Sequence, residues 1–141
     1  MKPTILIIEN NSNDEMLAQM AFDQVAPRIN VVVRRNGAEA LDYLLWIRQS
    51  GDTYPHLILL DLKMPKLGGM EVLRQVKFDD HTRFIPIVVF SSSAEPEDIL
   101  NAYLLGANSY IQKPMDFNEL IYIATYIKLY WLDWNQLPSR Y

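Results

Sequence analysis

The sequence predicts an α/β protein built on a doubly wound parallel sheet of five strands. Along the 141 residues, short apolar runs rich in Ile and Val alternate five times with longer segments that have helical spacing. The runs are continuously apolar and do not alternate with polar residues, which indicates strands that are covered on both faces. The length is that of about one ordinary domain, so we expect residues 1–141 to form one domain.

Five segments are predicted as strands. Four of them are strongly apolar: TILII at 4–8, NVVV at 30–33, LILL at 57–60 and PIVVF at 86–90. The fifth, SYIQK at 109–113, is less apolar but lies at the corresponding interval.

Helix signals occupy the segments between these strands. Ser12 and Glu15 form an S-x-x-E capping box, and an apolar stripe follows as far as Pro27. Proline and acidic residues in a first turn, and glycine after a last turn, mark the other helices. These start or stop signals are Asn36-Gly37 before a helix at 38–49, Gly68-Gly69, Pro96 with Gly106, and Asp116 before a helix at 117–134.

Composition limits the classes of function. With 50% hydrophobic and 21% charged residues, the chain has the composition of a soluble globular protein, and its apolar runs are too short to cross a bilayer. It has no cysteine, which excludes disulfides and thiolate metal sites, and no secretory signal pattern, so we expect a cytoplasmic location. The net charge of −4 disfavours nucleic acid as a partner.

Polar side chains follow the predicted strands where functional groups gather in doubly wound sheets, beyond the carboxyl ends. Oxygen ligands from Glu9, Asn10 and Asp61 suit a hard cation such as Mg²⁺. Lys113 and Ser91 suit the oxygens of a phosphoryl group. Asp61 is therefore a candidate nucleophile that would form an aspartyl phosphate.

Structural roles remain open for the same residues. An acid such as Asp61 commonly caps a turn, Glu9 and Asn10 could cap the first helix, and Ser91 could be an ordinary strand-end hydroxyl among three successive serines.

Four segments of the chain together resemble the receiver domains of two-component response regulators: ILIIEN, LLDLKMPKLGGMEVL, IPIVVFSSS and GANSYIQKP. The resemblance spans roughly residues 4–127. It implies a flavodoxin-like fold with strand order 2-1-3-4-5, and phosphotransfer from a sensor histidine kinase. It also implies these roles: Asp61 as phosphoacceptor, Lys113 as the catalytic lysine, Glu9, Asn10, Asp61 and the main-chain carbonyl of Lys63 as Mg²⁺ ligands, Ser91 and Tyr110 as switch residues, and Pro114 after a cis peptide bond.

Two positions depart from the receiver pattern. Most receivers have a metal-binding Asp where this chain has Asn10, so one negative charge is missing and we expect Mg²⁺ to bind weakly. Gly68 stands where receivers often have Asp or Asn, so the third helix should lack a side-chain cap.

The ending YWLDWNQLP resembles the tails of small response regulators that serve bacterial, notably cyanobacterial, phytochromes. We therefore expect residues 128–141 to form an extended C-terminal helix and tail. The resemblance also implies a bacterial phytochrome as a candidate kinase partner, and a homodimer through the fourth and fifth helices and the fifth strand. The downstream partner would be another protein.

Two-component signalling by a single-domain response regulator is the preferred hypothesis, and the chain is not expected to be an enzyme that acts on metabolites. One alternative is a pseudo-receiver, in which Asn10 has removed phosphorylation and the domain serves protein contacts. Others are a flavodoxin-like cofactor protein and an aspartyl-phosphate hydrolase. The cofactor protein is disfavoured because the loop ENNSND lacks a Ser/Thr/Gly phosphate cradle. The hydrolase is disfavoured because Lys63 stands where a second Asp is needed.

Overall fold

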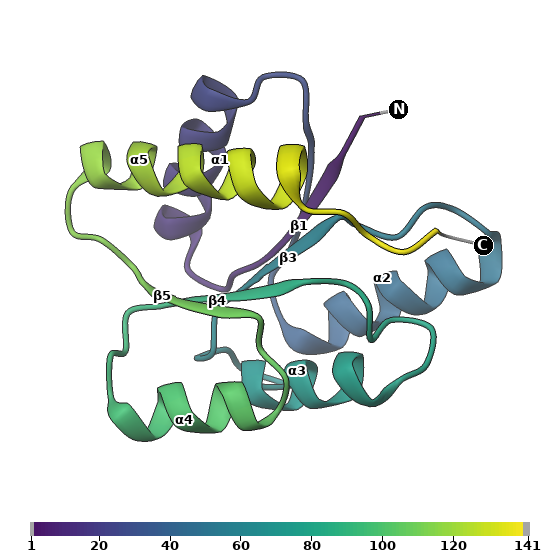
Figure 1. The fold of residues 1–141 in the computed structure, drawn as a ribbon. Coiled ribbons are helices and arrows are strands. Elements are labelled where there is room, and N and C mark those ends of the chain that lie inside the picture. Colours follow the sequence, from purple (N-terminus) through teal and green to yellow (C-terminus); the bar gives the residue numbers. More distant parts are fainter. Residues whose placement is uncertain (1, 140–141) are drawn as a thin grey trace.

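Five parallel strands form the central sheet, in the order β2-β1-β3-β4-β5 (Figure 1). The computed structural model describes residues 2–139. The strands are β1 (Thr4–Ile8), β2 (Asn30–Arg34), β3 (Leu57–Leu60), β4 (Ile87–Ser91) and β5 (Ser109–Gln112). The predicted fold class and strand order are confirmed, and each predicted strand lies within one residue of its observed bounds.

Helices cover both faces of the sheet (Figure 1). They are α1 (Ser12–Val25), α2 (Gly37–Ser50), α3 (Gly69–Phe78), α4 (Pro96–Leu104), α5 (Phe117–Ile127) and a π-helical segment, η1 (Lys128–Trp134). In Figure 1, α1 and α5 lie on one face, whereas α2, α3 and α4 lie on the other. None of the helices within residues 2–139 is long and apolar enough to cross a membrane.

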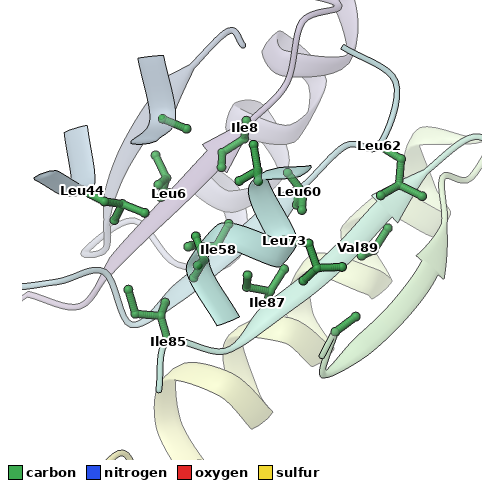
Figure 2. Packing of buried hydrophobic residues seen from close by; sticks show 14 of the residues in the cluster. Leu6, Ile8, Leu44, Ile58, Leu60, Leu62, Leu73, Ile85, Ile87 and Val89 are labelled. Carbon is green, nitrogen blue, oxygen red and sulfur yellow. The ribbon is translucent and has the colours of Figure 1, made fainter. Parts of the chain in front are cut away.

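Two hydrophobic clusters hold these layers together, one on each face of the sheet. Alternate residues of one strand point to opposite faces, so Ile58 and Leu60 pack toward α2 and α3, whereas Leu57 and Leu59 pack toward α1 and α5. Figure 2 shows the first cluster, with Leu73 of α3 against the strands. All four residues of β3 are buried, as the continuous apolar run predicted.

Helix α1 begins differently from the prediction. Its N-cap is Asn11, whose side chain accepts a hydrogen bond from the Asp14 backbone N–H at 2.9 Å. The proposed capping box of Ser12 and Glu15 is therefore wrong, since Ser12 is already inside the helix. Glu15 is buried and forms an ion pair with Arg35 at 3.0 Å, which joins α1 to the end of β2.

The last helix changes its winding after Ile127. The apolar stripe predicted one helix from 117 to 134, with Tyr130 and Trp134 facing the core. Instead α5 continues into the π-helical η1, in which Tyr130 and Trp134 are 57% and 76% exposed. A π-helical turn holds more residues than an α-helical one, so it rotates the later side chains away from the stripe. Of the predicted tail, residues 140–141 lie outside the described residues.

The two edges of the sheet are β2 and β5. On β2 the carbonyl of Val33 is not used by the β1–β2 ladder; instead it accepts a hydrogen bond from Arg34 Nη1 at 2.7 Å. The Arg34 guanidinium also lies over the ring of Tyr43 on α2, 4.6 Å from its centre. A side chain of β2 thus covers part of its own outer edge.

Candidate functional site

Four predicted site residues meet where the parallel strands end. Glu9 directly follows β1, Asp61 follows β3, Ser91 ends β4 and Lys113 follows β5. The backbone N–H of Asp61 bonds to the last residue of β1, so the β1 and β3 ends are held side by side. Glu9 and Asp61 are only 4% and 7% exposed. The sheet therefore presents two nearly buried carboxylates at its carboxyl edge.

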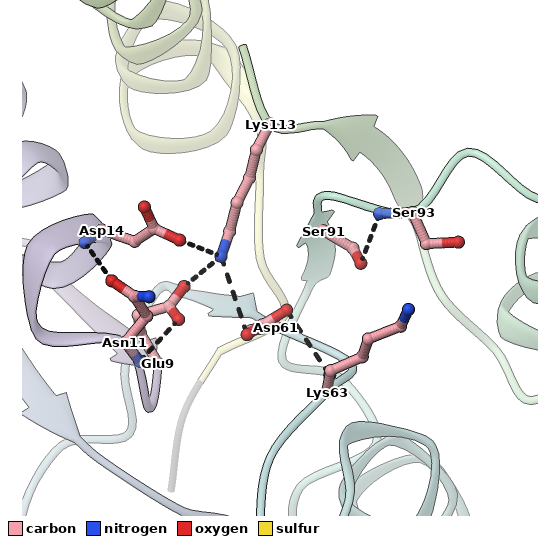
Figure 3. Close-up of polar contacts among 8 residues, drawn as sticks. All are labelled: Glu9, Asn11, Asp14, Asp61, Lys63, Ser91, Ser93 and Lys113. Atoms are coloured by element: carbon pink, nitrogen blue, oxygen red, sulfur yellow. Dashed lines mark hydrogen bonds and ion pairs between the residues drawn. The ribbon is translucent and has the colours of Figure 1, made fainter. Parts of the chain in front are cut away.

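The amine of Lys113 lies among three carboxylates (Figure 3). Its Nζ is 2.7 Å from Glu9 Oε2, 2.8 Å from Asp14 Oδ2 and 3.6 Å from Asp61 Oδ2. The lysine side chain is 11% exposed, so these contacts are largely shielded from water. Lys113, Glu9 and Asp61 are therefore brought together as the sequence predicted.

Asp14 is a member of this cluster that the sequence analysis missed. It lies in the first turn of α1, and the sequence analysis assigned it no role. Asn11 fixes this turn, because its side chain accepts a hydrogen bond from the Asp14 N–H. The signal that could have found Asp14 is its place directly after the β1 loop, which ends beside the same sheet edge.

Burial and charge set the protonation of the cluster. Burial raises the pKa of the Glu9 carboxyl to about 7, even though the hydrogen bond from Lys113 acts to lower it. Burial alone would lower the pKa of the Lys113 ammonium, but hydrogen bonds to Asp14 and Glu9 and the charge of Asp61 raise it overall. The lysine is therefore held as a cation, whereas burial disfavours the charged form of Glu9 despite its contact with that lysine.

The loop between β3 and α3 shapes the other side of Asp61. The Lys63 N–H lies 3.5 Å from Asp61 Oδ1, and the Lys63 side chain is exposed. At Gly69 the backbone N–H bonds to Leu62 O at 3.0 Å, and a Cβ on this glycine would lie 2.4 Å from the Asp61 carbonyl oxygen. Gly68 caps α3 without a side-chain hydrogen bond, as predicted. The loop can fold against Asp61 only because residue 69 has no side chain.

Ser91 and Tyr110 are joined through the main chain of Ser93. Ser91 is fully buried, and its Oγ accepts a hydrogen bond from the Ser93 N–H at 3.2 Å. The Tyr110 hydroxyl donates to the Ser93 carbonyl at 2.9 Å. The Ser93 hydroxyl in turn donates to Asp98 at 2.6 Å and accepts from the Glu95 N–H, at the start of α4. Of the three serines, sequence reasoning chose Ser91 and missed Ser93.

The donor set fits a hard divalent cation. Three carboxylates surround one ammonium in a largely buried cluster, so acidic oxygens outnumber the cationic partner. Asn10, next to Glu9, is exposed, and no side-chain hydrogen bond of Asn10 is found within residues 2–139. In the same residues no three His, Cys, Asp or Glu side chains form a metal-binding group. A metal here would need the Asn10 amide and a main-chain carbonyl besides the acids.

The Lys113–Pro114 peptide bond is trans, since no peptide bond among the described residues is cis. The cis bond that the receiver resemblance implied for Pro114 is therefore wrong for this structure. The trans form of such a bond is lower in free energy by about 0.5–1 kcal/mol when nothing else selects the isomer.

Curated relatives match nearly the whole chain. It is 40% identical over 135 residues to the probable methanogenesis regulatory protein FilR2 of Methanothrix harundinacea, covering 96% of this chain and 87% of that protein. It is 31% identical over 139 residues to the response regulator Rcp1 of Synechocystis, covering 96% of this chain and 92% of that protein.

Solved structures show the same fold. The phosphorylated cyanobacterial phytochrome response regulator RcpA matches with a TM-score of 0.89 and 37% identity, over 99% of this chain and 100% of that one. The Mn²⁺-bound form of Rcp1 matches with a TM-score of 0.82 and 29% identity, over 97% and 99% of the two chains.

The family model for the response regulator receiver domain matches residues 5–125. The general role of this family is phosphorylation-dependent signalling, and its members bind Mg²⁺ or Mn²⁺ at an acidic pocket. This chain belongs to the response regulator receiver domain family.

Proposed function

We propose that Asp61 accepts a phosphoryl group from a sensor histidine kinase. A carboxylate oxygen of Asp61 would attack phosphorus, the bond from phosphorus to the histidine nitrogen would break, and the imidazole would leave with the electron pair. The observation that carries this proposal is the position of Asp61, which is 7% exposed at a strand end with a lysine amine 3.6 Å from its carboxylate.

The surrounding residues would stabilise charge on the transferring group. Lys113 would move from its carboxylate partners to a phosphoryl oxygen, since the charge it neutralises grows there in the transition state. Glu9, Asn10, Asp61 and the Lys63 main-chain carbonyl would hold Mg²⁺. When bound, this ion would neutralise negative charge on the phosphoryl oxygens. The domain would in this way assist its own phosphorylation and dephosphorylation.

The signal would leave the site through Ser91 and Tyr110. When Ser91 turns its hydroxyl toward the phosphoryl group, it gives up the hydrogen bond from the Ser93 N–H. Tyr110 bonds to the carbonyl of the same residue, so movement of Ser93 would reach both the tyrosine and the start of α4. The population of two states of this face would then shift, which changes affinity for a partner protein.

The partner surface would be formed by α4, β5 and α5. Exposed apolar side chains gather there: Leu100, Tyr103 and Leu104 on α4, and Tyr122 and Tyr126 on α5. We propose that residues 1–141 act as one receiver domain that forms a homodimer through this surface and then signals to another protein. The kinase partner would be a sensor histidine kinase, and the similarity to RcpA, a cyanobacterial phytochrome response regulator, favours a bacterial phytochrome.

Intact-mass measurement after treatment with acetyl phosphate tests the phosphoacceptor. We expect a gain of about 80 Da, one phosphoryl group in place of a proton, that requires Mg²⁺ and is lost in Asp61→Asn. Asp23→Asn, which removes an exposed acid from α1, should keep the gain. A gain of the same size in Asp61→Asn would refute the assignment.

A pseudo-receiver is the second candidate, favoured by one observation, the exposed amide of Asn10 in place of a metal-binding acid. In that case the wild-type protein would show neither a mass gain nor a response to beryllofluoride with Mg²⁺. The family fold and the dimer would be retained.

A further inference from the structure

Asp14 contacts the catalytic lysine but has no part in the chemistry described above. Its Oδ2 accepts a hydrogen bond from Lys113 Nζ at 2.8 Å, while Asp61 lies at 3.6 Å from the same amine. The stronger contacts of the amine are therefore directed away from the phosphoacceptor, toward α1 and the end of β1. Figure 3 shows Asp14 and Asp61 on opposite sides of the lysine amine.

The position of Asp14 is fixed by its own element. Asn11 caps the first turn of α1 through the Asp14 N–H, so the carboxylate projects from a defined helix start. The Asp14 side chain is 36% exposed and that of Lys113 11%, so the ion pair is partly shielded from water. Charge-assisted hydrogen bonds of this kind are stronger than neutral ones.

Asp14 adds a third carboxylate to the cluster, on the side of the Lys113 amine that faces α1. It competes with Asp61 for this amine, which lies 2.8 Å from Asp14 and 3.6 Å from Asp61. Transfer of the amine to a phosphoryl oxygen must therefore break or weaken the contact with Asp14.

We propose that Asp14 is a positioning residue that holds the Lys113 amine away from Asp61 in the unphosphorylated protein, and thereby sets how readily the site accepts a phosphoryl group. This inference rests on the proposed function of Asp61. It assigns to the first turn of α1 a role in the resting state, beyond the favourable charge of an acid near a helix N-terminus.

Beryllofluoride binding followed by ¹⁹F NMR tests the proposal without turnover. The probe is added to the full chain at a Mg²⁺ concentration high enough that a further increase changes nothing, which removes any effect of Asp14 on metal affinity. Asp14→Asn keeps the shape of the side chain but not its charge, so the amine is released more easily. We expect it to bind beryllofluoride about five- to tenfold more tightly than wild type, the effect of weakening one partly shielded hydrogen bond to a charge.

Two variants control for other effects. Asp23→Asn removes the same charge from an exposed position of α1 and should bind the probe like wild type. Asp14→Glu keeps a carboxylate in reach of the amine and should return the affinity most of the way to the wild-type value. The rate of phosphorylation by acetyl phosphate at saturating Mg²⁺ should follow the same order.

An affinity of Asp14→Asn equal to or weaker than that of wild type overturns the inference, because Asp14 then does not oppose the activated state. A gain of the same size in Asp23→Asn also overturns it, since helix charge alone would explain the effect. A wild-type protein that shows neither beryllofluoride binding nor a mass gain instead overturns the proposed function, and the inference with it.

Discussion

Asn10 supplies a neutral amide at the position where the receiver resemblance implies a metal-binding acid. Replacement by Asp adds a charge beside the proposed cation. The gross attraction is several kcal/mol, at about 4 Å and an effective dielectric constant near 20, and desolvation offsets much of it. We expect Asn10→Asp to tighten Mg²⁺ binding about tenfold, measured by calorimetric titration of the unphosphorylated protein.

The matched control is Asn101→Asp, which adds the same charge at an exposed position of α4. It should leave the dissociation constant for Mg²⁺ nearly unchanged. An unchanged Mg²⁺ dissociation constant in Asn10→Asp would mean that residue 10 does not contribute to the metal site.

Glu9 makes the metal-free protein less stable as the pH rises. Its folded pKa is about 7 and its ordinary value is 4.5, so between these pH values the folded state binds more protons than the unfolded state. The free energy of unfolding therefore falls as the pH rises through this window. We expect Glu9→Gln to raise the free energy of unfolding by about 1–3 kcal/mol at pH 8, measured by urea unfolding in the presence of a metal chelator.

The difference between Glu9→Gln and wild type should shrink as the pH is lowered and vanish below about pH 4.5, where Glu9 is protonated in both states. Added Mg²⁺ should stabilise wild type more than the variant. A variant that is less stable than wild type at pH 8 would show that the Glu9 carboxylate stabilises the folded state on balance.

At the scale of elements, the strands were predictable and the helix ends were not. A buried parallel strand is a continuous apolar run, and no other element competes for LILL at 57–60. The α1 cap was misplaced because Asn11 and Ser12 are both good N-cap residues, and the choice between them depends on how β1 leads into the helix. The sequence of the π-helical η1 has ordinary helical spacing, so no local pattern predicts the change in winding.

The site was predictable wherever a side chain directly follows a strand. Glu9, Asp61 and Lys113 meet because parallel strands end at one edge, which the order of elements already dictates. Asp14 was missed because its role depends on a contact between segments far apart in the chain. Ser93 was missed although its hydroxyl bonds locally, to Asp98 and the Glu95 N–H, because three successive serines do not show which one caps α4. The contact between Asp14 and Lys113 joins residues 99 positions apart.

Helix α4 depends on Ser93 for its start. Its N-cap residue, Glu95, makes no side-chain capping bond, while the Ser93 hydroxyl accepts from the Glu95 N–H and donates to Asp98. We expect Ser93→Ala to lower the free energy of unfolding by about 1 kcal/mol, as for loss of a capping side chain, measured by urea unfolding. Ser92→Ala, at the exposed neighbouring serine, should change it little. Equal effects of the two substitutions would argue against this role.

For the whole molecule, the proposed dimer surface is the most accessible prediction. Tyr126 on α5 is 68% exposed, and a charge there would have to be buried in the interface. We expect Tyr126→Glu to weaken the dimer about tenfold or more, measured by analytical ultracentrifugation over a range of concentrations.

Phe78→Glu is the control, because Phe78 is 70% exposed at the end of α3, which is not part of the proposed surface of α4, β5 and α5 (Figure 1). It should leave the dissociation constant of the dimer nearly unchanged. A wild-type protein that stays monomeric at all concentrations would refute the dimer. A Phe78→Glu variant that dissociates as readily as Tyr126→Glu would place the contact elsewhere.

The guanidinium of Arg34 makes the β2 edge of the sheet less open to pairing than the β5 edge. Because it occupies the Val33 carbonyl and rests on Tyr43, an incoming extended chain would have to displace it before pairing with β2. Growth of the sheet into an intermolecular fibre is thereby hindered at β2. Specific self-association is left to the opposite side of the sheet, which carries the exposed tyrosines of α4 and α5.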